Sequence, residues 1–325
     1  MTVDLVTLGE TMGLVAASGT GPFRVGSGAT ISFGGAETNV AIGVSRLGHR
    51  AAWFGRLGSD PLGDLILDGL RGEGVSVDRV RRETEVPTGL MLREHRTADR
   101  VRVSYYRRDL AGSRLAPDDL DLDVLTRARV LHVSGITPAL SGTAKAAVHK
   151  AVTAAREAGV LVSFDLNYRA ALWSAEDAGR EFATLVEHSD IVFAGLEEAE
   201  LVTGPARRSG RADEDAARQA VAEDLASRGP SDVVVKLGVD GALAIVDGEV
   251  VRSPGRKVES VDPVGAGDAF VAGYLSGLLD GDPPSRRLAR GNVCGAFAVS
   301  VAGDWEGLPR RSELTMLDGT ENVTR

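Results

Sequence analysis

Residues 262–270 read Asp262-Pro263-Val264-Gly265-Ala266-Gly267-Asp268-Ala269-Phe270, and they guide the interpretation of the whole chain. Two glycines, each within three residues of an aspartate, precede an apolar pattern with helical spacing. The first turn of a helix leaves backbone N–H groups unpaired and carries partial positive charge. Glycines let those amides approach a phosphate closely. The stretch therefore predicts a phosphate site at a helix N-terminus, with Asp268 within reach of a hydroxyl that faces the same phosphate.

This stretch differs from a P-loop, because no Gly-Lys-Ser/Thr sequence follows the glycines. A simpler interpretation is that Asp268 only caps a helix. The length of the pattern, its place late in the chain and the series of strands and helices before it favour the functional interpretation.

Outward from this stretch, strand-like and helix-like segments alternate. Apolar strand-like runs lie at 3–9, 51–57, 130–133, 160–164, 191–193 and 233–237. Helical patterns lie at 36–47, 61–70, 142–157, 178–187, 213–227, 266–279 and 285–301. Such alternation indicates an α/β fold with a mostly parallel central sheet and helices on both faces, which makes three layers.

Two regions interrupt the alternation. Residues 12–33 are rich in Gly, Ser and Thr, and residues 86–107 contain two runs of alternating polarity, 88–93 and 101–106. We expect these segments to form a small β lid over the active site, inserted into one domain that spans 1–325.

Composition narrows the function class. The chain has 325 residues, a net charge of −9 and 43% hydrophobic residues, as in a globular protein. The acidic balance argues against nucleic acid as a partner, and no apolar run is long enough to span a membrane. Cys294 is the single cysteine, in an apolar stretch where a buried core position is expected. We expect a cytoplasmic protein, because the N-terminus also lacks a signal-peptide pattern.

A second motif precedes the first by more than half of the chain: Gly34-Gly35-Ala36-Glu37-Thr38-Asn39-Val40-Ala41. Together the two motifs resemble the N- and C-terminal signatures of the ribokinase/PfkB-type carbohydrate kinases, and the resemblance covers nearly the whole chain. It implies a ribokinase-like fold, ATP and Mg²⁺ as cofactors, and Asp268 as general base. It also implies an anion hole formed by Gly265, Ala266 and Gly267. A substrate site near the two motifs would be formed by Gly34, Gly35, Asn39 and Asp262.

The resemblance also implies positions for ATP and the metal. ATP is expected near Lys236, Gly238 and Gly241, after a buried strand. Asn292 is expected on the adenine side, although a polar residue at this place is nearly as typical of a helix exterior. Glu198 matches the glutamate of the family's Asn-x-x-Glu metal motif. Gly195 replaces the asparagine, so Glu198 could act through water or simply belong to a solvated acidic helix face. A monovalent cation is a further candidate cofactor.

The substrate side resembles the 2-keto-3-deoxygluconate kinase subgroup. A Tyr-x-Arg in the lid and an Asp-x-Asn-x-Arg after a strand supply the matching residues, namely Tyr105, Arg107, Asn167 and Arg169. Two arginines could hold a sugar-acid carboxylate in bidentate pairs. Asp304 is expected to contact substrate or close the site. Met91 stands where the subgroup often has another lid tyrosine, which leaves the exact sugar open.

Several functions remain as alternatives. The first is phosphorylation of 2-keto-3-deoxygluconate, and the second is phosphorylation of a neutral sugar such as fructose or ribose. A non-catalytic nucleotide- or sugar-binding module is a third. A dinucleotide oxidoreductase is the weakest, because the segment after the first strand lacks Gly-x-Gly-x-x-Gly. A homo-oligomer, dimer or larger, is expected from the resemblance.

Overall fold

The computed structural model describes residues 3–97, 100–205 and 211–318. Its largest element is an eight-stranded sheet in the order β14-β13-β12-β11-β10-β9-β1-β4. The six strands from β12 to β4 pair in parallel, and β13 and β14 continue the sheet antiparallel. The strands are β1 (Leu5–Leu8), β4 (Ala51–Phe54), β9 (Val130–Ser134), β10 (Leu161–Asp165), β11 (Ile191–Gly195), β12 (Asp232–Lys236), β13 (Ala242–Val246) and β14 (Glu249–Ser253).

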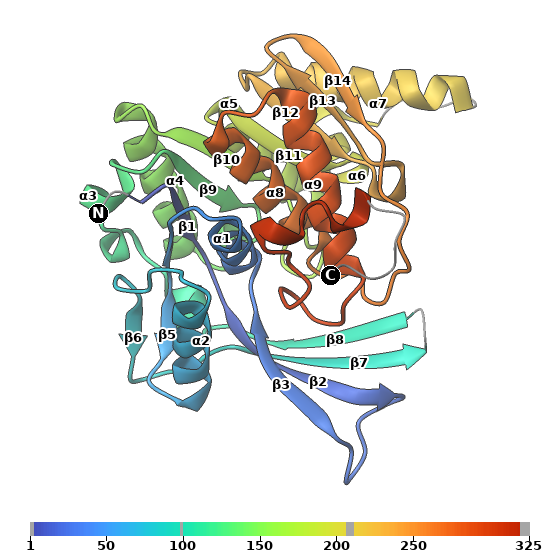
Figure 1. Ribbon diagram of the computed structural model, residues 1–325. Helices are drawn as coiled ribbons and strands as arrows, with labels where there is room; N and C mark the ends of the chain where they lie inside the picture. The colour runs from blue at the N-terminus through green and yellow to red at the C-terminus, as the bar shows by residue number, and fades with distance from the viewer. Residues whose placement is uncertain (1–2, 98–99, 206–210, 319–325) are drawn as a thin grey trace.

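Helices cover both faces of this sheet (Figure 1). One apolar core packs the sheet against α4 (Gly142–Glu157), α5 (Ala175–Glu187), α6 (Leu196–Thr203) and α7 (Arg211–Ala226). The other packs it against α1 (Ala36–Arg46), α2 (Pro61–Gly72), α8 (Ala266–Asp280) and α9 (Pro284–Val299). The short helix α3 (Leu122–Leu125) precedes β9. The three-layer α/β fold expected from the alternating pattern is therefore confirmed.

A second sheet has four strands in the order β3-β2-β7-β8 and extends from the body (Figure 1). Its strands are β2 (Met12–Thr20), β3 (Ala29–Gly34), β7 (Leu90–Thr97) and β8 (Arg100–Tyr106). Strands expose alternate side chains on opposite faces. Met12, Leu14 and Met91 are buried together on one face, whereas Ile31 and Tyr106 are exposed. The weakly strand-like segment 12–33 thus contributes two strands.

A third, two-stranded sheet was not expected from the sequence. It pairs β5 (Arg56–Gly58) in parallel with β6 (Arg81–Glu83). Three-residue strands carry too little periodicity to stand out in a sequence. Arg56 holds this corner through ion pairs with Glu83 and Asp119.

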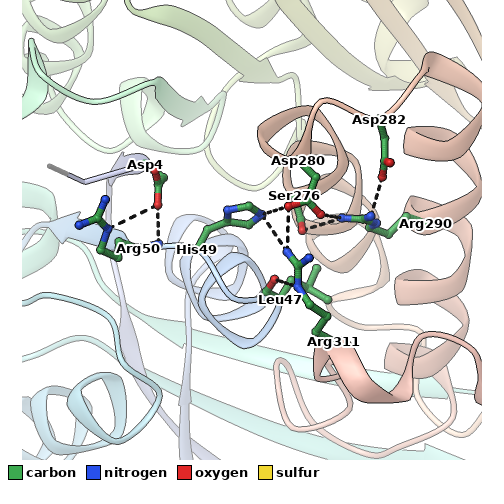
Figure 2. A network of polar contacts seen from close by, with 9 residues as sticks. All are labelled: Asp4, Leu47, His49, Arg50, Ser276, Asp280, Asp282, Arg290 and Arg311. Carbon is green, nitrogen blue, oxygen red and sulfur yellow. Dashed lines mark hydrogen bonds and ion pairs between the residues drawn. The ribbon is translucent and has the colours of Figure 1, made fainter.

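Helix α8 is fixed at its C-terminal end by a network of charged groups (Figure 2). Asp280 accepts hydrogen bonds from Arg290 of α9 at 2.6 Å and from Arg311 at 3.0 Å, and its carboxylate lies 3.3 Å from His49. Arg311 also donates to the carbonyl of Leu47, just after α1. The network joins α8 to α1, α9 and the C-terminal segment, so the opposite end of α8 is held at a fixed place in the body.

In the described part of the chain, no helix combines the length and the hydropathy that crossing a bilayer requires.

Candidate active site

A cavity of about 1070 Å³ lies where the carboxyl ends of the parallel strands meet the inner face of the four-stranded sheet. Ligands of open α/β sheets bind at this edge, because loops from neighbouring strands converge there. Asp165 and Lys236 end β10 and β12 and line the cavity from the body. Met91, Arg93 and Tyr105 line it from the small sheet.

The predicted phosphate loop borders this cavity. Helix α8 begins at Ala266, directly after Gly265, whose φ of 76° lies in the left-handed region. A Cβ at Gly265 would lie 2.0 Å from the carbonyl oxygen of Asp304, so only glycine fits here. Among the described residues no side chain caps this helix. Its first amides are therefore available to an anion at the helix N-terminus.

Asp268 lies in the first turn of α8 and faces the cavity. Its carboxylate accepts a hydrogen bond from the amide nitrogen of Asn39 at 2.8 Å and a longer one from Asn167 at 3.4 Å. Burial raises the pKa of Asp268 to about 7, the Asn39 hydrogen bond opposes this rise, and the negative charge of Asp165 adds to it. A carboxylate with this pKa, held by two amides, is suited to accept a proton from a substrate hydroxyl.

Lys236 and Asp165 form an ion pair near the N-terminus of α8. The ammonium lies 2.8 Å from each carboxylate oxygen of Asp165 and 3.5 Å from the position that a Cβ on Gly267 would take. Burial lowers the pKa of Lys236, but the carboxylates of Asp165 and Glu198 outweigh it, so the pKa is raised. Lys236 is thus cationic beside the predicted anion hole.

Glu198 lines the cavity, but its carboxylate already has backbone partners. One oxygen accepts from the amide of Gly195 at 2.6 Å, and the other accepts from the amide of Tyr168 at 3.0 Å. Within the described ranges, no group of three or more His, Cys, Asp or Glu side chains could hold a metal. A magnesium ion here would therefore take most of its ligands from phosphates and water, which suits its preference for retaining water.

On the substrate side, Gly34, Gly35, Tyr105, Arg107 and Arg169 all line the cavity, as predicted from the sequence. The two arginines differ. Arg107 is largely buried and pairs with Glu10 at 2.5 Å, with its guanidinium 5.6 Å from the Tyr105 ring. Arg169 is exposed and donates to the carbonyl of Tyr168 at 3.0 Å.

Sequence reasoning missed two buried glutamates in the cavity wall, Glu10 and Glu37. Burial raises the pKa of Glu10 to about 7, although the Arg107 charge opposes this rise. Burial also raises the pKa of Glu37, whose Oε1 accepts hydrogen bonds from Ser134 and Thr137 at 2.7 Å each. Both residues belong to short glycine motifs, and a glutamate in such an apolar setting was the available signal.

Arg93, from β7 of the four-stranded sheet, lies between the carboxylates of Asp262 and Asp304. Asp262 is fully buried behind the phosphate loop, whereas Asp304 lines the cavity. Arg93 of β7 donates to both carboxylates. Nothing in the sequence around Arg93 distinguished it from the exposed arginines of the same segment.

Three predicted nucleotide residues, Gly238, Gly241 and Asn292, do not line this cavity. They lie beside it, around the turn after β12 and the end of β14. The amide nitrogen of Asn292 donates to Ser253 and to the carbonyl of Pro254. A Cβ at Gly241 would lie 2.1 Å from the Ser253 carbonyl oxygen. Gly241 and Asn292 therefore both have structural roles at the end of β14.

Cys294 is buried, as expected, and burial raises the pKa of its thiol to about 12. A thiol with this pKa is not a nucleophile at neutral pH.

Comparison with known proteins gives a consistent result. The sequence pattern of the pfkB family of carbohydrate kinases matches residues 4–311. A 2-dehydro-3-deoxygluconokinase of Bacillus subtilis is 38% identical over 97% of this chain and 95% of its own length. A 2-dehydro-3-deoxygalactonokinase of Haloferax volcanii is 37% identical over 94% of this chain and 93% of its own. The crystal structure of a PfkB protein from Polaromonas sp. JS666 superposes with a TM-score of 0.85, at 35% identity, over 97% of this chain and 99% of that one.

The family match spans both glycine motifs and nearly the whole chain, and the relatives align over almost their full length. The chain therefore belongs to the pfkB family of carbohydrate kinases.

Proposed function

We propose that this kinase transfers the γ-phosphoryl group of ATP to the terminal hydroxyl of 2-keto-3-deoxygluconate (2-dehydro-3-deoxygluconate), giving the 6-phosphate. The observation that carries this proposal is the presence of two arginines, Arg107 and Arg169, in a cavity that also contains the predicted base. A guanidinium binds a carboxylate in a planar, two-pronged pair, and a neutral sugar has no group that requires one. The names of the two curated relatives support a keto-deoxy sugar acid.

In this proposal Asp268 removes the proton of the attacking hydroxyl, and Asn39 and Asn167 hold its carboxylate in place. The amides of Gly265, Ala266 and Gly267 receive the transferring phosphoryl group at the positive end of α8. Asn167 and the glycines Gly34 and Gly35 face the sugar. The four-stranded sheet serves as the lid that excludes water.

ATP and Mg²⁺ are the cofactors that this chemistry requires. Lys236 supplies a cation beside the anion hole, and the turn through Gly238 and Gly241, with Asn292 behind it, is the proposed nucleotide side. Mg²⁺ would neutralise the phosphates, with Glu198 acting through water.

A role for a monovalent cation stays a prediction, and comparing activity in potassium, sodium and choline buffers tests it. A cytoplasmic homo-oligomer also stays a prediction, and sedimentation of the purified protein tests its size.

A neutral-sugar kinase is the second candidate, because Arg107 is already paired with Glu10. If that pair persists with substrate bound, Arg169 alone is left for a carboxylate. The fold and the Asp268 chemistry would be the same in either case.

A substrate panel distinguishes the two candidates. We expect ADP release with MgATP to be far faster with 2-keto-3-deoxygluconate or 2-keto-3-deoxygalactonate than with fructose or ribose. We also expect Arg169→Ala to raise the KM for the sugar acid by roughly 10- to 100-fold, because a hydrogen bond to a charged group contributes about 1.5–3 kcal/mol. The Kd for MgATP, measured by calorimetry, should stay unchanged. Preference for a neutral sugar, or equal weakening of both ligands, would exclude the carboxylate clamp.

A glycine substitution tests the anion hole. Gly265→Ala places a Cβ against the Asp304 carbonyl at a positive φ, so we expect kcat to fall by about 100-fold or more, as when an oxyanion donor is lost. Gly281→Ala is the matched control at the other end of α8: it has a φ of 79° and no described heavy atom within 4 Å of the added Cβ. The control should lose about 1–2 kcal/mol of unfolding free energy and keep its kcat. Equal kcat in the two variants contradicts the anion-hole assignment.

The pH dependence of kcat/KM follows from the raised pKa of Asp268. A base must be ionised, so kcat/KM should rise with pH, pass its midpoint near pH 7 and level off above it. Glu10 titrates in the same range and faces the same cavity. The Glu10→Gln variant removes that second titration and should retain the rise. A flat kcat/KM between pH 5.5 and 8.5 in both proteins, with MgATP saturating, excludes Asp268 as the base.

Asp268→Asn tests the same residue through activity and stability together. Turnover should fall by about 100-fold or more, because general-base catalysis contributes 10²–10⁴-fold. The folded-state pKa of Asp268 lies above the ordinary aspartate value of 3.8, so the unfolding free energy of the wild type falls as pH rises from about 4 to 7. The Tm of Asp268→Asn relative to the wild type should therefore be higher at pH 8 than at pH 4.5. Retained turnover removes the general-base role.

A further inference from the structure

Arg93 stands out among the charged residues of the cavity wall. It comes from β7 of the lid, and its side chain is only 3% exposed. Its guanidinium forms two pairs, one with Asp262 at 3.3 Å and a shorter one with Asp304. These carboxylates are 1% and 9% exposed and come from segments on either side of helices α8 and α9. One lid side chain thus bridges two buried carboxylates of the body.

Both carboxylates are tied to the phosphate loop. Asp262 accepts a hydrogen bond from the amide of Val264 at 3.1 Å and another from the amide of Gly303 at 3.3 Å. The carbonyl of Asp304 packs against Gly265, the residue before α8, and its carboxylate packs against Gly34 at the end of lid strand β3. A shift of either aspartate would therefore move the backbone that presents the predicted anion hole.

The electrostatics require a cation at this place. Two carboxylates buried side by side repel each other, and removing them from water without a partner is costly. Burial raises the pKa of Asp304, and the Arg93 guanidinium counteracts that rise. A planar guanidinium can serve two carboxylates at once, whereas an ammonium is a point charge without that fork.

We propose that Arg93 is a positioning residue for phosphoryl transfer, which fixes the Gly265–Gly267 loop through Asp262 and Asp304 when the lid strand lies over the cavity. This inference rests on the proposed anion hole. It adds that the position of the lid determines whether the anion hole is formed. The sugar binds under the lid, so the same contact would couple sugar binding to a competent phosphate loop. Arg93 acts through the two aspartates and not as a ligand of the sugar.

Steady-state kinetics of Arg93→Gln and Arg93→Lys test this role. We expect kcat to fall on the order of 100-fold in Arg93→Gln, the effect of a small misplacement of catalytic groups, while both KM values stay near those of the wild type. Arg93→Lys should remain nearly as slow, because a lysine ammonium keeps the charge but cannot bridge two carboxylates as a planar guanidinium does. Arg102→Gln is the matched control, since Arg102 is exposed on β8, opposite Glu94, and should keep its kcat.

Chemical rescue separates positioning from support of the fold. Guanidinium ion at millimolar concentration should restore part of the kcat of Arg93→Ala, and ammonium ion should not. If the single variants do not fold, Arg93→Gln with Asp304→Asn removes one buried carboxylate together with the cation. That double variant should fold and remain slow, because the bridge to Asp262 is still missing.

Three results would overturn the inference: full kcat in Arg93→Lys, full kcat in the folded double variant, or a raised KM for the sugar with unchanged kcat. The last would make Arg93 a substrate ligand. Gly265→Ala, assayed in parallel, keeps the two proposals distinguishable. If Gly265→Ala retains turnover, the anion-hole proposal is wrong. If only the Arg93 variants retain turnover, the anion-hole proposal stands and only the role of Arg93 is wrong.

Discussion

The close approach of Gly265 to the backbone of Asp304 is the contact on which the rest of the site depends. A side chain at this position would collide with the Asp304 carbonyl, and the left-handed turn that begins α8 would be strained. The turn directs the first amides of α8 and the Asp268 carboxylate toward the same cavity. The charged network at the far end of the helix holds Asp280 from three sides, so the direction of α8 is set at both ends (Figure 2). The predicted base and the proposed anion hole are thus both positioned by one helix.

Acidic groups outnumber basic ones in the cavity wall, which bears on how it could hold an anionic nucleotide. Among the described lining residues, seven are acidic and five are basic, and most of the basic groups already have acidic partners. Burial raises the pKa values of Glu10 and Asp268, and the neighbouring carboxylates of Glu37 and Asp165 add to the rise. A nucleoside triphosphate bound as proposed would add further negative charge to this site. Lys236 and the N-terminus of α8 could balance part of that charge. A magnesium ion would supply the rest, because Mg²⁺ needs few protein ligands when phosphates and water are present.

The sequence predicted those features that local patterns encode. Buried parallel strands appear as continuous apolar runs, and the two glycine motifs mark places where backbone approaches a ligand, so the fold and the position of Asp268 could be derived. Arg93 could not, because its importance arises from burial and from partners distant in sequence, while Glu10 and Glu37 were marked only by their apolar surroundings. An arginine in a lid strand looks like a solvated one until the fold brings Asp262 and Asp304 to it. Asn292 donates to the Ser253 carbonyl at the end of β14, a contact that its sequence did not indicate, and its place on the adenine side stays a prediction.

The pairing of Arg93 and Arg107 with acidic residues of the body would give the proposed lid a defined closed position. Arg93 reaches Asp262 and Asp304, and Arg107 reaches Glu10, so both contacts form only where the lid strands approach the sheet edge. The two pairs differ in depth, because the Arg93 group is almost fully buried while Arg107 retains some exposure. The deeper pair is the costlier one to break, since separated buried charges lose their partners in a low dielectric. The shallower pair is the one that a substrate carboxylate could exchange, which would let substrate binding act at Arg107 while Arg93 keeps the phosphate loop in place.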